Sequence, residues 1–151
     1  MKAIGLILTV AVLSLAGLST ALASDSGSRA TTVSTAKTHL GKVIVNGRGL
    51  TLYLFEKDRR GKSMCSGACA TYWPPLITHG KPMAAGGARQ SLLGTIKRSN
   101  GARQVTYAGH PLYYYAPDRA RGQITGQALN QFGAPWYALA PSGTEIHIPG
   151  M

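Results

Sequence analysis

Two pairs of tyrosine and aspartate are the residues whose types and spacing first suggest chemistry. Tyr53 lies five positions before Asp58, and sixty residues later Tyr113 lies five positions before Asp118. A phenol and a carboxylate at one site could act as a general acid and a general base. In a strand, however, the tyrosine leaves one face, and an aspartate at the strand's end typically accepts backbone N–H groups of the following turn. We therefore expect both aspartates to hold equivalent turns and not to catalyse a reaction.

Two cysteines form a second candidate site. Cys65 and Cys69 are the only cysteines of the chain, and in an exported protein such a pair forms a disulfide by default. Positions four apart also lie on one face of a helical turn, so two thiolates could instead bind copper or carry out thiol redox chemistry. Met64 beside them, and a histidine or methionine elsewhere, would then complete the copper site. The side chains available for this are His79, Met83 and His110.

No other arrangement of residues is typical of an enzyme. The four histidines are far apart in the sequence, and only His110 adjoins a signature strand, so it is the histidine that we favour as a ligand. The chain has no glycine-rich phosphate loop, no nucleophile elbow and no close pair of carboxylates suited to glycoside hydrolysis. We expect a protein that is not an enzyme and has no cofactor. The alternative is a copper site at Met64, Cys65, Cys69 and His110.

The segments around the tyrosines form a tandem repeat. Both copies carry a tyrosine, a second aromatic residue two positions later, an aspartate, and then an arginine. Self-similarity at a fixed spacing indicates two copies of one structural unit. We expect the two tyrosines to occupy equivalent strands, related by an approximate two-fold axis or by translation. The signature residues are Tyr53, Phe55 and Asp58 in the first copy, and Tyr113, Tyr115 and Asp118 in the second.

Short apolar runs separated by turn residues predict an all-β or β-rich fold made of β-hairpin units. Residues 43–45 and 50–55 flank an Asn-Gly turn, residues 95–98 and 103–107 form a second hairpin, and a third leads into residues 144–148. Both faces of residues 50–55 are apolar, so this strand should be covered on both sides. We expect helix only as short turns after each signature strand, the first ending at Pro74.

The N-terminal segment has the features of an export signal. Residues 1–23 contain one lysine, a long apolar run and a small-x-small sequence, so we expect a signal peptide cleaved after Ala23. No cysteine lies near this point, so we expect no lipid attachment and no transmembrane segment in the mature chain. Residues 24–39 are rich in Ser, Thr, Ala and Gly, which predicts a disordered leader. Residues 40–151 then form one domain of two repeats, about 40–98 and 99–151.

The two motif copies, joined by Cys65-x3-Cys69-x3-Trp73-Pro-Pro-Leu, resemble a family of bacterial secreted-repeat proteins. These proteins are often labelled predicted lipoproteins and carry a Y-x-(F/W/Y)-x-x-D motif. The resemblance extends from about Leu40 to Ile148. It implies an envelope location and a repeat fold, but no activity, because none is established for the family. This chain departs from many members in lacking the acylated cysteine.

The net charge of the chain indicates which class of partner it can attract. Sixteen lysines and arginines stand against five acidic residues, giving a net charge of +11. Such a surface attracts anionic envelope components, such as phospholipid or lipopolysaccharide head groups. Export removes the chain from nucleic acid. We expect a secreted or periplasmic binding or structural module, with a copper-binding or thiol-redox protein using Cys65 and Cys69 as the alternative.

Overall fold

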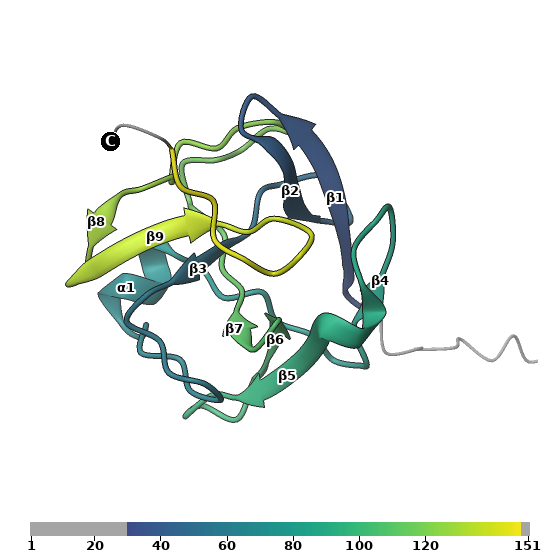
Figure 1. Ribbon diagram of the computed structural model, residues 1–151. Helices are drawn as coiled ribbons and strands as arrows, with labels where there is room; N and C mark the ends of the chain where they lie inside the picture. The colour runs from purple at the N-terminus through teal and green to yellow at the C-terminus, as the bar shows by residue number, and fades with distance from the viewer. Residues whose placement is uncertain (1–29, 149–151) are drawn as a thin grey trace, which may run out of the picture.

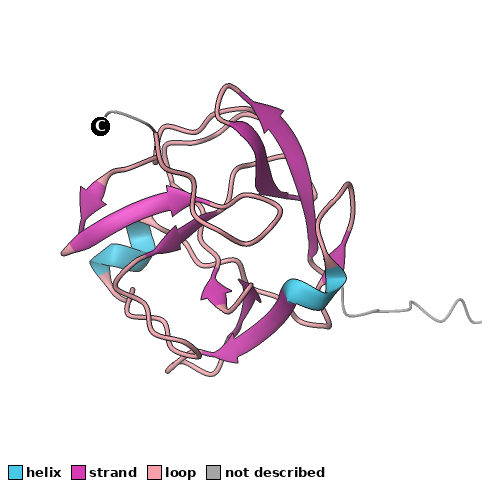
Figure 2. Cartoon of the chain, viewed as in Figure 1, coloured by secondary structure: helices cyan, strands magenta, loops and turns pink. Residues whose placement is uncertain are grey.

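The computed structural model describes residues 30–148, which form short strands with very little helix (Figures 1 and 2). The predicted β-rich fold is confirmed. The predicted signal peptide and its cleavage point lie outside the described residues. The strands are β1 Thr32–Thr38, β2 Gly41–Asn46, β3 Tyr53–Phe55, β4 Met83–Ala84, β5 Leu93–Lys97, β6 Arg103–Tyr107, β7 His110–Pro111, β8 Asn130–Gln131 and β9 Ala134–Ala138. The helical segments are α1 Ala68–Tyr72 and the 3-10 turn η1 Gln90–Leu92.

Within residues 30–148 the strands form three small sheets, with orders β2-β1-β4, β3-β9-β8 and β5-β6-β7. β1 and β2 pair along their whole length, from Val33 opposite Asn46 to Thr38 opposite Gly41, while β4 adds to β1 in parallel. In Figure 1 the sheet of β1 and β2 lies at the top right, and the sheet of β5, β6 and β7 lies at the bottom.

The sequence interpretation of residues 24–39 as a disordered leader is wrong for Thr32–Thr38, which form β1. The segment lacks an apolar period because Val33 is the one side chain of this strand that is completely buried in the core. The rest of the strand is held by its backbone ladder to β2, and β-branched threonines suit such a ladder. The early part of the proposed leader, residues 24–29, lies outside the described residues.

Of the three predicted hairpins, one forms along its whole length and two form only in part. The second is confirmed, with β5 and β6 paired from Leu93 opposite Tyr107 to Lys97 opposite Arg103. The first turns at Asn46 as predicted, but its second strand soon leaves β2, and Tyr53–Phe55 pair with β9 instead. The third is short: Leu139 bridges to Glu145, the Ala140 N–H donates to the Thr144 carbonyl oxygen, and the Ile146 N–H donates to that of Ala138.

Both faces of β3 are buried, as the sequence predicts. Tyr53 and Phe55 belong to an aromatic core cluster, whereas Leu52 and Leu54 belong to an aliphatic one. The aromatic cluster also contains both tryptophans and the disulfide. Its buried members are Val43, Val45, Tyr53, Phe55, Cys65, Cys69, Trp73, Tyr113, Ile124, Trp136 and Ala138.

A helical turn follows the first signature strand only. α1 ends before Pro74, as predicted, but residues 125–128 of the second copy form turns without helix. Here Gly126 lies directly against two buried rings: a Cβ atom at this position would be 2.8 Å from Trp73 and 3.0 Å from Tyr53. The second copy therefore brings its backbone against the aromatic cluster, where the first copy has its disulfide and α1.

The two copies meet around an approximate two-fold axis between their signature tyrosines. The Tyr53 N–H donates to the carbonyl oxygen of Tyr113 at 2.9 Å, and the Tyr113 N–H donates to the carbonyl oxygen of Tyr53 at 3.0 Å. Such a reciprocal contact is what a two-fold relation produces. The two tyrosines are equivalent in this contact, as predicted, but only Tyr53 lies in a strand, β3, whereas Tyr113 forms isolated bridges to Tyr53 and Pro75.

Further backbone bonds cross from one copy to the other in the same reciprocal way. The Ile44 N–H donates to the carbonyl oxygen of Leu139 at 2.8 Å. The Val105 N–H donates to the carbonyl oxygen of Leu76 at the same distance. Ile44 thus corresponds to Val105, an offset of sixty-one residues, whereas the tyrosines are sixty apart. Each copy completes its hairpin with the segment that follows the tryptophan of the other copy.

Candidate functional site

The signature tyrosines and aspartates are paired across the two copies. The Tyr53 hydroxyl donates to Asp118 Oδ2 at 2.5 Å, and the Tyr113 hydroxyl donates to Asp58 Oδ2 at 2.7 Å. The sequence analysis weighed only pairs within one copy, as a possible acid and base, and it did not predict this exchange. The sequence holds little information about this exchange, because a five-residue spacing repeated in both copies is compatible with pairing within a copy or between copies.

Each aspartate also holds the turn that follows its strand, as predicted. Asp58 Oδ1 accepts the backbone N–H of Met64 at 2.6 Å, and Asp118 Oδ1 accepts that of Thr125 at 3.1 Å. The aspartates are themselves held by equivalent turns, since the N–H of Asp58 donates to the Phe55 carbonyl oxygen. Both oxygens of each carboxylate are thus used within the protein.

A stack of four aromatic rings lies beside these pairs. The rings of Trp73 and Trp136 are parallel, 3.9 Å apart and inclined by 7°. Phe55 stacks on the outer face of Trp136 at 4.0 Å, and Tyr115 packs on Trp73 at 4.4 Å. Each outer ring therefore packs on the tryptophan of the other copy. The four rings fill the core around the two-fold axis, so the second signature aromatic of each copy has a packing role.

Burial sets the protonation of these groups. It raises the pKa of the Tyr53 and Tyr113 hydroxyls far above the ordinary value, so both remain hydrogen-bond donors. It also raises the pKa of Asp58 to about 6, against the smaller opposing effects of the Met64 N–H and the Tyr113 hydroxyl. A hydroxyl that stays protonated cannot take up a proton from a substrate, and its raised pKa also makes it a weak acid. The pairs therefore fit a structural role better than an acid and base pair.

The disulfide between Cys65 and Cys69 is present, as predicted. Cys65 borders a cavity of about 630 Å³ lined by residues 61–66 and 97–99, which we name the basic groove. Three cationic side chains line it, Lys62, Lys97 and Arg98, and no carboxylate lies among its lining residues.

Arg98 is fixed at the side of the basic groove. Its Nη1 donates to Ser63 Oγ at 2.9 Å and to Gln104 Oε1 at 2.5 Å. Its Nη2 donates to the carbonyl oxygen of Cys65 at 2.6 Å. A guanidinium has five N–H donors, so Nε and the second hydrogen of Nη2 remain for another acceptor. The positive charge is held in place by neutral partners.

The proposed copper ligands are not brought together. His110 lines a separate cavity of about 120 Å³ with Asp58 and Arg60, and burial there lowers its pKa. Cys65 and Cys69 are joined to one another, so neither offers a thiolate in this state. Within residues 30–148 no group of three or more His, Cys, Asp or Glu side chains is placed to hold a metal ion.

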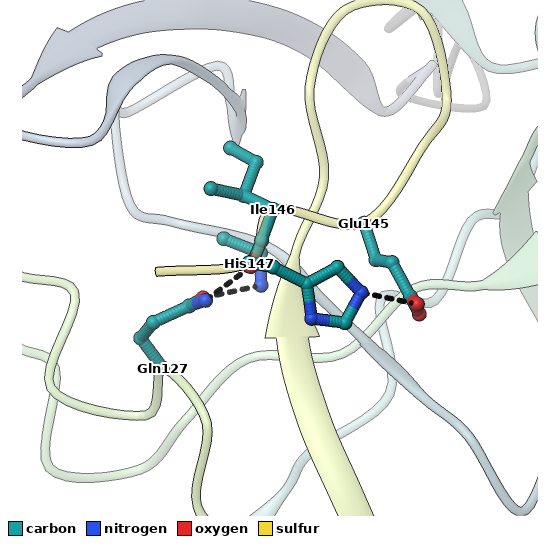
Figure 3. A network of polar contacts seen from close by, with 5 residues as sticks. Gln127, Glu145, Ile146 and His147 are labelled. Atoms are coloured by element: carbon teal, nitrogen blue, oxygen red, sulfur yellow. Dashed lines mark hydrogen bonds and ion pairs between the residues drawn. The ribbon is translucent and has the colours of Figure 1, made fainter. Parts of the chain in front are cut away.

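The basic residues have few acidic partners. In the part of the chain that the structure describes, the only ion pair joins Glu145 to His147, at 2.7 Å (Figure 3). Gln127 anchors the same segment by donating to the carbonyl oxygen of Ile146, as Figure 3 also shows. No lysine or arginine among residues 30–148 forms a salt bridge. Two of the acidic residues, Asp58 and Asp118, are turned inward to the tyrosines.

No helix within residues 30–148 is long and apolar enough to cross a membrane.

A model of one protein family, described as a secreted repeat of unknown function, matches residues 34–77 and 94–140. These two segments make up more than half of the chain, and each contains one signature strand. Comparisons with curated proteins and with solved structures found no match. The resemblance seen in the sequence is confirmed, and the chain belongs to this family of secreted repeat proteins of unknown function.

Proposed function

We propose that the protein is a non-enzymatic binding module of the bacterial envelope, periplasmic or released after cleavage behind Ala23, that holds anionic groups in its basic groove. The observation that carries this proposal is the groove itself. Lys62, in a turn, and Lys97, at the end of β5, line the groove beside the fixed guanidinium of Arg98, with no carboxylate in the lining. Phosphate and carboxylate groups match the two free N–H donors of such a guanidinium.

The signature residues support a binding role over catalysis. Tyr53 and Tyr113 are completely buried and Asp118 is only 7 % exposed, so a substrate would not reach these three groups, whereas Asp58 is partly exposed and lines the small cavity of His110. Their hydrogen bonds are satisfied by one another and by backbone N–H groups. They give the basic groove a rigid support, because Ser63 contacts both Arg98 and the Tyr113 hydroxyl.

The test compares two variants that each lose two positive charges. Lys62→Ala/Lys97→Ala removes the flexible cations of the basic groove, while Lys37→Ala/Lys42→Ala removes an exposed pair at the far end of β1 and β2. Binding to phosphatidylglycerol vesicles should weaken by about 30-fold in the groove variant, at about 1 kcal/mol per lysine, and much less in the control. Phosphatidylcholine vesicles should not bind, and added inorganic phosphate should compete. Equal losses in both variants would show attraction by net charge without a site.

A copper-binding or thiol-redox function is the second candidate. The observation that favours it is that Cys65 borders a groove with three cationic side chains, which would stabilise a thiolate after reduction. A thiol count on the exported protein, followed by copper titration of the reduced protein, tests this function. Absence of free thiols together with absence of copper uptake after reduction would remove it.

A further inference from the structure

The turn between β8 and β9 holds a phenylalanine in a backbone conformation that it rarely adopts. Phe132 has φ 58° and the following Gly133 has φ 90°, which are the two left-handed positions of a type I′ hairpin turn. Asparagine followed by glycine is the usual sequence there, because a larger side chain is strained in this region. Non-glycine residues in strained conformations concentrate at functional sites.

The strained residue presents an apolar ring to solvent. Phe132 is 38 % exposed and its neighbour Tyr72 is 54 % exposed, with ring centroids 6.0 Å apart. The two rings and Gln131 line an open hollow of about 340 Å³. Because much of the Phe132 ring is left outside the core, packing alone does not account for a phenylalanine in this turn.

The hollow is held rigidly by the aromatic core beneath it. Trp73 Nε1 donates to Gln131 Oε1 at 2.9 Å, and Trp136 Nε1 donates to the Gln131 carbonyl oxygen at 3.0 Å. Since the amide oxygen is used by Trp73, the amide N–H₂ group of Gln131 is the part left to donate to a ligand. Lys57 fixes the other side of the turn, because its ammonium donates to the Phe132 carbonyl oxygen at 3.1 Å.

We propose that Tyr72, Gln131 and Phe132 form a saccharide site that binds one ring of an acidic polysaccharide. The C–H face of a sugar ring packs on aromatic rings and the Gln131 amide hydrogen-bonds a sugar hydroxyl. Lys57, beside the turn and outside the lining of the hollow, attracts a carboxylate on the sugar. Two exposed rings are far too little apolar surface for a stable protein interface, whereas the hollow suits a single ring and has the usual combination of aromatic walls and one fixed polar group. This site is separate from the basic groove and does not depend on the function proposed for it.

The binding test uses polygalacturonate as the acidic polysaccharide and dextran as the neutral one. Phe132→Asn and Tyr72→Ala should each weaken polygalacturonate binding at least tenfold, and dextran should bind the wild type more weakly than polygalacturonate. Met83→Ala is the matched control, because Met83 is an apolar side chain with 50 % exposure outside the site. Lys62→Ala/Lys97→Ala should keep the binding, which separates this site from the basic groove.

A second readout separates a ligand role from a packing role. Asparagine tolerates the left-handed region, so Phe132→Asn should raise the melting temperature while it abolishes binding. A lower melting temperature would show that the Phe132 ring is needed for folding and would overturn the proposal. Undiminished polygalacturonate binding by this variant would also overturn it, as would a wild type that binds neither polysaccharide. Loss of phosphatidylglycerol vesicle binding in Phe132→Asn, without any saccharide binding by the wild type, would assign the rings to a membrane surface instead.

Discussion

The hydroxyl groups of the two signature tyrosines have different surroundings. Tyr53 donates to Asp118 and accepts the backbone N–H of Gly126 at 3.2 Å, so its proton has one acceptor. Tyr113 donates to Asp58 and lies 2.7 Å from Ser63 Oγ, which already accepts Arg98 Nη1–H and the Cys65 N–H and therefore donates to Tyr113. Each tyrosine proton thus has one acceptor, an aspartate, and a buried donor without an acceptor is costly. The aspartates differ in burial, because Asp118 is buried whereas Asp58 is partly exposed.

This difference predicts unequal effects of replacing the two aspartates by asparagine. Asp118→Asn should lower the free energy of unfolding by about 2 kcal/mol, because the amide cannot accept the Tyr53 proton while keeping its bond to Thr125. Asp58→Asn should cost less than about 1 kcal/mol, because Asp58 is partly exposed and burial already disfavours its charged form. Denaturant unfolding at pH 7 measures both. A larger loss in Asp58→Asn would contradict this account of the two surroundings.

The pKa of Asp58 predicts how stability depends on pH. The folded protein holds this proton up to about pH 6, whereas the unfolded chain releases it near its ordinary value of 3.8. The folded state therefore binds more protons between these values, and its stability falls as the pH rises from 4 to 6. The fall from this carboxyl is at most about 3 kcal/mol.

The control for this pH dependence is Asp58→Asn. The pKa of His110 is lowered by burial, so it acts in the opposite direction, but it is present in both proteins and cancels in their difference. The free energy of unfolding of the wild type should rise relative to that of Asp58→Asn as the pH is lowered from 6.5 to 4. A constant difference over this range would mean that Asp58 titrates normally in the folded protein.

At the level of the elements, the segment of each signature tyrosine pairs with a segment of the other copy. β3 belongs to the first copy by sequence but pairs with β9 of the second, and Tyr113 pairs with Pro75 of the first. The stacked rings of Trp73 and Trp136 lie where these shared strands meet. Gly126 closes this junction, because its backbone passes against Trp73 and Tyr53.

Gly126→Ala should therefore destabilise the fold by roughly 1–3 kcal/mol, the usual effect of overpacking a dense core. The added methyl group would be 2.8 Å from the Trp73 ring and 3.0 Å from the Tyr53 ring, and both rings are completely buried. Gly47→Ala is the control, since its new Cβ atom would meet only the partly exposed Thr32, at 3.3 Å. Thermal melts of the two variants should differ clearly, and equal melting temperatures would show that the rings can move aside.

Local features of the fold could be predicted from the sequence, and features that depend on pairing between distant segments could not. The hairpin of β5 and β6, the burial of both faces of β3, and the turn-holding role of Asp58 follow from residue types within a few positions. The sequence does not predict strand β1, because its threonines and its serine form a backbone ladder only when β2 lies beside them. The exposed rings of Tyr72 and Phe132 gave no sequence signal, because Phe132-Gly133 is not a usual turn sequence.

For the whole molecule, the exchange between copies is the property that makes the two repeats one folding unit. Backbone bonds, tyrosine and aspartate bonds, and stacked rings all cross between the copies around the same axis. A single copy would lose its partner in each of these contacts. The motifs alone do not reveal this exchange. Each tyrosine has one aspartate five positions later in its own copy and a second, equivalent aspartate in the other copy.

A double-mutant cycle tests the exchange directly. We predict that Tyr53→Phe and Asp118→Asn, which lie in different copies, show a coupling energy between about 0.5 and 3 kcal/mol, as expected for residues in contact. Tyr53→Phe and Asp58→Asn, which lie in the same copy, should add within about 0.5 kcal/mol. Denaturant unfolding of the wild type, the three single variants and the two double variants gives both values. Coupling between Tyr53 and Asp58, with additivity between Tyr53 and Asp118, would contradict the exchanged pairing.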